Sequence, residues 1–339
     1  MSRFQVRPFH FDDVGAAALL LAERHQRDRS RLPLLSKTFD SPEECAAVLR
    51  HTMQTERAFG VVALAGDRPV GFLLAEKQLH APTSLAAQFI PPYTLGFPLH
   101  GHAVADGHSA TEIYRLMYGE VAARGVERGF FAHRAYVIPG DRDTEEAWVN
   151  LGFGRALVCA VRDTSPLASV PANGEIEIHQ ATSEDIDVVM RLEHANMVHH
   201  FGSPIFWPYL HETMNAAREY QQALLSDPEN AHFVAYRNGE PQGMDTFNPP
   251  DWVSPLLQSG RSIYLFQGVV EESARGNGVG KLLLDRSMSW AREQGYEQCI
   301  LHFASANASG SAFWLSQGFV PVEYAMTRHI DERIGWARP

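Results

Sequence analysis

The chain repeats a pattern of elements along its length, and this repeat constrains its fold more than any other feature. Residues 4–13 and residues 176–185 both read as a short alternating strand followed by a helix start, at an offset of 172 residues. At the same offset, residues 61–71 and 233–243 both read as a strand, a turn-forming cluster and a second strand. The sequence therefore predicts two copies of one α/β unit.

A third pair of segments gives the extent of each copy. Residues 147–153 parallel residues 313–319 at an offset of 166, so the first copy holds about six extra residues. Between the copies, residues 163–174 are rich in Pro, Ser and Gly and lack the periodicity of a helix or a strand. We predict a mixed α/β fold in which each domain has a central β-sheet flanked by helices. The predicted parts are a first domain over 1–163, a linker over 164–174 and a second domain over 175–339.

Composition excludes several classes of function. The chain has 29 Lys and Arg against 40 Asp and Glu, and its net charge of -11 repels a phosphate backbone, so we expect no nucleic-acid partner. The apolar run at 16–22 is far shorter than the roughly 20 residues of a membrane span, and residues 1–5 begin no signal peptide. We therefore expect no membrane association and a cytoplasmic location. Cys45, Cys159 and Cys299 are odd in number and far apart, which indicates neither a disulfide framework nor a thiolate zinc site.

One strand–loop–helix segment carries the clearest chemical signal. An apolar strand over 262–270 leads into a loop with three glycines, Gly276, Gly278 and Gly280, and then into an amphipathic helix. Backbone N–H groups at such a junction converge on an anion, and the helix N-terminus adds about half a positive charge. The pattern predicts a pyrophosphate-binding loop, to which Arg275 adds a direct contact.

Spacing separates this loop from other glycine-rich phosphate loops. Gly280-Lys281 is followed by Leu282, so a Walker loop would lack the hydroxyl that holds magnesium. The glycines also do not follow the dinucleotide spacing Gly-x-Gly-x-x-Gly, and they come late in their domain. A glycine-rich turn that binds nothing remains the alternative.

Two motifs then resemble one family. Residues 275–280 read Arg-x-x-Gly-x-Gly, with Val270 five residues ahead, and are similar to the acetyl-CoA loop of the GNAT superfamily of N-acetyltransferases. Residues 307–319 resemble that family's downstream Asn-x-x-Ala-x-x-x-Tyr-x-x-x-Gly-Phe element. The resemblance covers about residues 175–335, and with the internal repeat it implies a tandem GNAT protein.

The resemblance implies acetyl transfer from acetyl-CoA, as co-substrate, to a primary amine of a small-molecule acceptor. It assigns acetyl-CoA contacts to Gly268, Val269, Val270, Arg275, Gly276, Asn277, Gly278, Val279, Gly280, Asn307 and Trp314. In the first copy the loop position falls on residues 105–110, which hold one glycine and Asp106. Because an aspartate repels a pyrophosphate, we expect the first domain to be a degenerate scaffold without acetyl-CoA.

The candidate catalytic groups are a histidine and the residues able to act in place of a general-acid tyrosine. His302 lies five residues before Asn307, where several relatives carry a catalytic Glu, and a histidine with a pKa near 6.5 suits a general base. The alternative is a histidine that only fills a strand position. Trp314 stands where the family has its general-acid Tyr, and an indole N–H does not supply a proton. Three outcomes stay open: the thiolate leaves unassisted, Tyr324 or Tyr264 substitutes, or the chain is a non-catalytic acyl-CoA-binding or sensing protein.

Histidine groups elsewhere do not predict a metal site. His194 and His199 are five residues apart, off one helix face, and His199 and His200 point apart because they are adjacent. His100 and His102 would share one face of a strand, but without an acetyl-CoA loop behind them we expect packed or solvated side chains. We expect no bound metal.

Aromatic residues follow this histidine segment in the second domain. They are able to line a pocket for an apolar or cationic acceptor, or to form the core of the contact between domains. The residues concerned are Phe201, Phe206, Trp207 and Tyr209.

Overall fold

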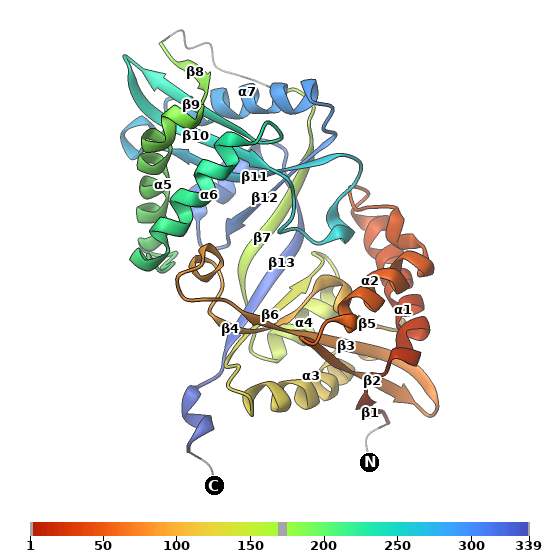
Figure 1. Ribbon diagram of the computed structural model, residues 1–339. Coiled ribbons are helices and arrows are strands. Elements are labelled where there is room, and N and C mark those ends of the chain that lie inside the picture. The colour runs from red at the N-terminus through yellow and green to blue at the C-terminus, as the bar shows by residue number, and fades with distance from the viewer. Residues whose placement is uncertain (1–2, 169–174, 338–339) are drawn as a thin grey trace.

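The computed structural model describes residues 3–168 and 175–337, and it contains two halves with the same order of elements (Figure 1). The first half holds β1 (Gln5–Pro8), α1 (Val14–Arg31), α2 (Pro42–Gln54), β2 (Ala58–Ala65), β3 (Arg68–Leu79), β4 (Tyr93–Phe97), β5 (His102–Val104), α3 (Ala110–Val126), β6 (Ala132–Val137), α4 (Arg142–Asn150) and β7 (Gly154–Asp163). The second half holds β8 (Glu177–Gln180), α5 (Ile186–Phe201), α6 (Met214–Ser226), β9 (Ala231–Arg237), β10 (Glu240–Asn248), β11 (Ser262–Val270), α7 (Val279–Glu293), β12 (Gln298–Ala304), α8 (Ala308–Ser316) and β13 (Val320–His329). β4 and β5 together occupy the place that β11 has in the second half.

Local capping repeats between the halves as well. Asp141 accepts a hydrogen bond from Thr144 N at the start of α4, and Asn307 accepts one from Gly310 N at the start of α8. These two N-cap residues are 166 positions apart, which is the offset of the late repeat. Short polar side chains satisfy the free N–H groups of a first helical turn, so the same cap starts the same helix in both copies.

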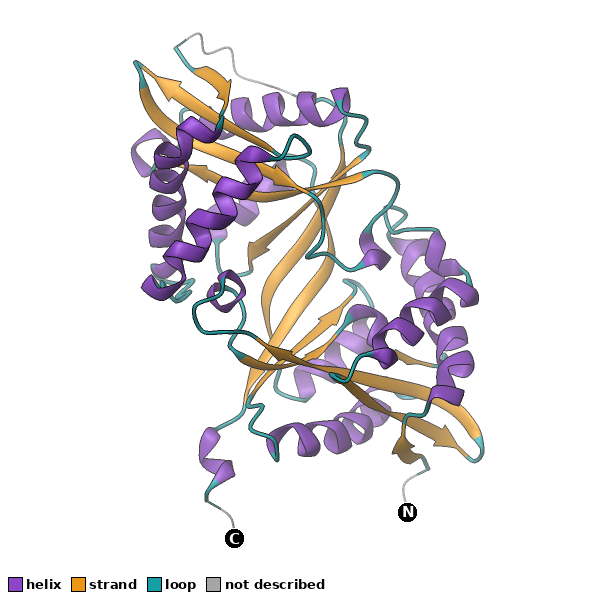
Figure 2. Ribbon diagram, in the orientation of Figure 1, coloured by secondary structure: helices purple, strands orange, loops and turns teal. Residues whose placement is uncertain are grey.

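The described strands form one continuous sheet that runs through both halves (Figure 2). Its order is β1-β2-β3-β4-β6-β13-β7-β12-β11-β10-β9-β8, and β5 pairs with β3 beside this path. The order shows an exchange of strands. β13, the last strand of the second half, pairs with β6 of the first half, while β7, the last strand of the first half, pairs with β12 of the second half. β7 and β13 also pair with each other at the centre of the sheet.

The sheet opens at one point in the second half. β11 and β12 are parallel and pair from Ser262 with Gln298 to Leu265 with Leu301, after which the pairing ends. The next residue of β11, Phe266, is an extra residue in the register with β10. A β-bulge bends its strand away from a neighbour. β11 and β12 therefore diverge beyond Leu265 and leave a gap in the sheet.

Helices cover both faces of the second half's sheet. On one face, Val189 and Leu192 of α5 pack with Val234, Met244 and Val269. On the other face, α7 contributes to a larger apolar cluster whose buried members include Leu283, Leu284, Met288, Phe233, Phe247 and Ile263. The third cluster fills the first half and crosses the junction to reach Ile300 and Val322. Each half thus has an apolar core of its own, and the exchanged strands join the two.

The predicted mixed α/β fold with two similar halves is confirmed. Residues 164–168 hold neither helix nor strand, whereas 169–174, the rest of the predicted linker, lie outside the described residues. The domain boundaries remain a prediction, because the exchange places β7 in the sheet of the other half. The three cysteines are buried and unpaired. Within the described ranges, no helix is both long and apolar enough to cross a membrane.

Candidate active site

A cavity of about 660 Å³ lies in the second half and reaches into the first. Ten of the eleven residues predicted to contact acetyl-CoA line it, and so does His302. Asn277 is the exception, since it is exposed and lies outside the lining. The lining residues named in the sequence prediction are Gly268, Val269, Val270, Arg275, Gly276, Gly278, Val279, Gly280, Asn307 and Trp314.

One end of the cavity is the glycine loop at the start of α7. Gly276 and Gly278 have φ angles of 79° and 82°, in the left-handed region that favours glycine. Gly278 is the N-cap of α7, and no side chain among the described residues caps this helix. A Cβ added at Gly276 would meet nothing within 4 Å, so the loop faces open space. The first amides of α7 are therefore available to an anion.

Polar side chains from three elements meet beside this loop. Arg275 Nε donates to Val270 O at 3.1 Å, and Arg275 Nη1 lies 3.4 Å from His199 Nδ1. His199 Nε2 lies 3.4 Å from Asn307 Oδ1, which also caps α8. The predicted Arg275 and Asn307 are thus linked through a histidine of α5 that the sequence did not assign to this site.

The cavity continues through the gap between β11 and β12. Leu265 and Leu301, the last pair of the two strands, line it, and so do Phe266 and His302 just beyond. Successive residues of a strand point to opposite faces of a sheet. The cavity therefore extends from one face of the sheet to the other at the point where the strands separate.

Trp314 closes one side of this gap. Its side chain is 9% exposed and packs against Gly268, where a Cβ would come within 2.7 Å of Trp314 Cη2. Asp245 lies beneath the same glycine and accepts a hydrogen bond from Ser287 Oγ at 3.1 Å. Burial raises the pKa of Asp245 to about 7, with the Ser287 bond opposing this rise. Sequence reasoning did not find Asp245.

His302 lies where the cavity passes through the sheet. Its Nδ1 is 3.0 Å from the Tyr264 hydroxyl, and burial, with a smaller contribution from Arg134, lowers the pKa of His302 to about 4. The sequence-based expectation of a value near 6.5 is therefore corrected, because the imidazole is shielded from water. Glu323 of β13 lies nearby, and burial raises the pKa of its carboxyl to about 8 despite the Arg134 charge. Both groups are mainly neutral at pH 7.

The exchanged strands bring a possible metal-ligand set together at this point. Cys159 pairs with Glu323 on one side and with His302 on the other, and the ligand atoms of the three lie within 4.8 Å of one another. The charge of Arg134 acts on both His302 and Glu323, and burial raises the pKa of the Cys159 thiol. A protonated thiol, together with a positive charge that acts on the other two groups, disfavours a cation. The absence of a metal remains a prediction.

The far end of the cavity is built largely by the first half. Residues of β6, β7 and the loop before β4 line it, none of which the sequence assigned to the site: Gln88, Phe89, Ile90, Arg134, Tyr136 and Leu157. The second half adds Trp207, Pro208, Trp252, Tyr264 and Ala325. The first half is therefore more than the scaffold that was expected, because it forms part of the cavity wall.

Other predicted residues take varied positions. Tyr264 lines the cavity, whereas Tyr324 lies on the opposite face of β13, since its neighbour Ala325 points into the cavity. From that face, its hydroxyl does not reach the cavity to replace the general-acid tyrosine. Phe201 and Phe206 are 60% and 70% exposed, so they line neither the cavity nor a core. Trp207 contacts Phe89 of the first half, at 6.2 Å between ring centres, while also lining the cavity.

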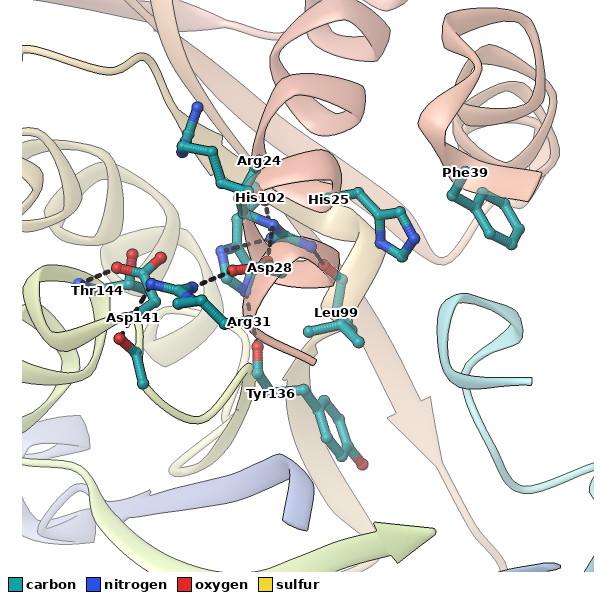
Figure 3. A network of polar contacts seen from close by, with 12 residues as sticks. Arg24, His25, Asp28, Arg31, Phe39, Leu99, His102, Tyr136, Asp141 and Thr144 are labelled. Atoms are coloured by element: carbon teal, nitrogen blue, oxygen red, sulfur yellow. Dashed lines mark hydrogen bonds and ion pairs between the residues drawn. The ribbon is translucent and has the colours of Figure 1, made fainter. Parts of the chain in front are cut away.

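In the first half, Arg24 and His102 belong to a buried network of polar side chains (Figure 3). Arg24 of α1 donates to the carbonyl oxygens of His102 and Leu99, and His102 Nδ1 lies 2.7 Å from the Tyr114 hydroxyl. His102 Nε2 donates to Tyr136 O at 2.8 Å, and burial lowers the pKa of His102 to about 3. Trp148, at the position equivalent to Trp314, is fully buried. His100 and His102 are therefore packed side chains, which was the expected alternative to a metal site.

The start of α3 also differs from the start of α7. Ser109 caps α3, and its side chain accepts a hydrogen bond from Glu112 N at 3.3 Å. The amide that an anion would use is thus already bonded to the chain itself. Together with Asp106 in the preceding loop, this cap supports the expectation that the first half lacks an acetyl-CoA loop.

Comparisons with known proteins agree with this architecture. Residues 195–319 match the Acetyltransferase (GNAT) family. A GCN5-related N-acetyltransferase from Sphaerobacter thermophilus shares 15% identity, with 97% of this chain and 96% of that chain covered and a TM-score of 0.61. A GCN5-related glucosamine N-acetyltransferase region of a fungal multi-domain GH3 beta-N-acetylglucosaminidase shares 13% identity, with 96% of this chain and 38% of that chain covered and a TM-score of 0.57. No curated protein matches the chain significantly.

The fold of the whole chain is similar to that of GCN5-related N-acetyltransferases. The match to the Acetyltransferase (GNAT) family covers residues 195–319, which lie in the second half, and the two similar halves of the chain agree with the tandem arrangement that the sequence predicted.

Proposed function

We propose that the chain is an acetyl-CoA-dependent N-acetyltransferase that acts on the primary amine of a small molecule and binds acetyl-CoA in its second half only. The observation that supports this best is the single cavity, which joins the uncapped start of α7 to the buried imidazole of His302. One end suits a pyrophosphate and the other suits proton transfer. Such a pair of subsites is what acyl transfer from acetyl-CoA to an amine requires.

The residues at the α7 end fit a pyrophosphate. α7 has 15 residues, long enough for a helix dipole, and its first amides face the cavity beside Gly276 and Gly278. Arg275 adds a positive charge at the same place. Beyond Leu265 the β12-facing edge of β11 has lost its strand partner, so residues 268–270 lie on an open edge where a pantetheine arm can pair, with Val270 O already accepting from Arg275 Nε.

The chemistry at the other end centres on His302. Acetyl-CoA supplies a thioester whose acyl carbon can bond to the amine nitrogen as its bond to sulfur breaks. His302 accepts the amine proton, and for this its Nδ1–H donates to the Tyr264 oxygen, which leaves the Nε2 lone pair free. Glu323 lies next to the ring, and burial keeps its carboxyl mainly protonated at pH 7. Trp314 shapes the gap and gives no proton.

Titration and turnover together test this function. Calorimetry with acetyl-CoA should give one site per chain, and a thiol-specific reagent should detect CoA release when a panel of primary amines is added. Two sites per chain would contradict the assignment to the second half. Tight acetyl-CoA binding without thiol release for any amine would contradict the transferase and favour an acyl-CoA-binding or sensing protein.

A further inference from the structure

The floor of the cavity crosses the junction between the two halves. Cross-strand pairs join Tyr136 to Ala325, Ala325 to Leu157, and Leu157 to Ala304, so these residues share one face of the sheet. All four line the cavity. The short side chains of Ala325 and Ala304 leave space above the sheet.

Arg134 lies at the first-half end of this floor and His302 at the other. Arg134 is two residues from Tyr136 in β6, and His302 is two residues from Ala304 in β12, so both point to the same face. Two strands, β13 and β7, separate them. They are also offset by about four residues along the strands, because Arg134 pairs with Thr327 whereas the row of His302 reaches β13 at Glu323. The backbones are therefore about 20 Å apart, at about 4.8 Å per strand and about 3.3 Å per residue, and the long side chain of Arg134 shortens the distance between the charged group and the imidazole.

The Arg134 guanidinium is buried without a matching anion. The residue is 8% exposed, its Nη2 donates to Phe89 O at 3.0 Å, and its Nε has no hydrogen-bond partner within the described residues. No carboxylate of the described chain forms an ion pair with it. Glu323 is near enough to sense its charge, but burial keeps that carboxyl mainly protonated at pH 7. A buried cation in this state is costly unless an anion joins it.

Apolar groups surround the space between Arg134 and His302. Phe89 lies 6.2 Å from Trp207 and 6.3 Å from Phe266 between ring centres, and Trp252 also lines the cavity. Gln88, next to Phe89 in the chain, holds this loop of the first half against the second half. Its amide donates to Pro208 O, and its Oε1 accepts from Leu210 N at 3.2 Å. This part of the cavity is thus lined by apolar groups and carries the positive charge of Arg134 at one end.

We propose that the acceptor is an amine that also carries a carboxylate and an apolar body, an amino-acid-like molecule whose carboxylate binds Arg134 while its amine faces His302. The proposal rests on the proposed function and names its substrate class. A guanidinium presents paired N–H groups that match a carboxylate, and a single negative charge balances a single cation. The acetyl donor reaches the gap from the glycine loop, so the carboxylate at Arg134 belongs to the acceptor.

Paired acceptors test the proposal in the full chain. Leucine, phenylalanine and 6-aminohexanoate are each compared with their carboxamides, which keep the amine and lose the charge, in the wild type, Arg134→Met and Arg134→Lys. The readout is the ratio of kcat/KM for acid over amide within one protein, so a general loss of fold cancels. We expect Arg134→Met to lower this ratio about 10- to 100-fold, through KM, as befits a charged hydrogen bond of about 1.5–3 kcal/mol. Arg134→Lys should restore part of it. Arg155→Met is the matched control, since Arg155 stacks on Tyr324 away from the cavity.

A binding experiment distinguishes a failure of the carboxylate site from a failure of the proposed transferase activity. Calorimetry with N-acetyl-leucine, which carries the carboxylate and needs no chemistry, should detect binding to the wild type and not to Arg134→Met. Binding without any acetyl transfer would contradict the transferase and leave the carboxylate site supported. Transfer with an unchanged acid-to-amide ratio in Arg134→Met would overturn the carboxylate site and leave the transferase supported. Selective loss of succinyl-CoA binding in Arg134→Met, with acceptors unaffected, would also overturn it, because the carboxylate would then belong to the donor.

Discussion

The indole of Trp314 rests on the backbone of Gly268, so closely that a Cβ at position 268 would come within 2.7 Å of Trp314 Cη2 and 2.8 Å of Cζ2. This contact places the aromatic ring of α8 against β11 at the gap through which the cavity passes. A glycine in the strand permits the close approach of another group. Gly268 and Trp314 therefore act as one structural unit.

The first prediction tests this unit. Gly268→Ala should destabilise the protein by about 1–3 kcal/mol, because the added methyl overpacks the contact. The cost should be smaller when Trp314→Phe is also present, since a smaller ring makes room. Urea unfolding of the four proteins measures the coupling. Gly15→Ala is the control: its Cβ meets nothing within 4 Å in α1, so it should be neutral or stabilising. Equal costs with and without Trp314 would contradict the contact.

The second prediction concerns the glycine loop. Gly278→Val forces a β-branched residue to φ 82° at the start of α7 and should abolish acetyl-CoA binding. Gly107→Val is the matched control, because Gly107 has φ 75° at the equivalent loop of the first half. Both variants should lose stability by about 1–2 kcal/mol, but calorimetry should show lost acetyl-CoA binding for Gly278→Val alone. Loss of binding in both would mean that the effect is not local to the loop.

The third prediction is a pH profile. A base must be neutral to accept a proton, and the pKa of His302 is lowered to about 4 by burial and by Arg134. With saturating acetyl-CoA and amine, kcat should stay flat as the pH falls to about 5 and then drop through about 4. His302→Ala should lose about 10²- to 10⁴-fold in kcat, and its profile should lack the drop through about pH 4. Full activity in that variant, with the fold intact by circular dichroism, would assign His302 a structural role only.

The fourth prediction follows from Asp245. Its pKa is raised from 3.8 to about 7, so between these values the folded protein binds a proton that the unfolded chain does not. The contribution of this carboxyl to stability is therefore greatest below pH 3.8 and is lost as the pH rises through about 7. Asp245→Asn should stabilise the protein relative to wild type at pH 8, by about 2–4 kcal/mol from the shift, and have little effect at pH 4. Urea unfolding at both pH values measures the difference. An equal effect at both values would show that the pKa of the Asp245 carboxyl is not raised.

The fifth prediction concerns the exchanged strands. Residues 175–339 expressed alone lack β7, which pairs with both β12 and β13, and so would expose two unpaired edges. This fragment should aggregate, whereas co-expression with residues 1–168 should give a soluble complex. Size-exclusion chromatography compares the two cases. A soluble, cooperatively folding second half would show that the exchange is not required for its stability.

Local patterns in the sequence determined which helices, strands and loops this protein forms. The repeat, the element order and the glycine loop depend on residues close together in the chain, such as the N-caps Asp141 and Asn307 or the positive φ of Gly278. Short-range turn and helix rules read such features directly. The position of His302 on its strand also followed from its spacing to Asn307.

Only the tertiary structure decided which distant residues share the cavity. Arg134 and Glu323 lie far apart in the sequence, and they meet near His302 because β13 inserts beside β6 and β7 beside β12. Strand order depends on packing and edge pairing across the whole chain, which a local pattern does not encode. The pKa of His302 depends on the same assembly, because the loss of water around the ring arises only when both halves close over it.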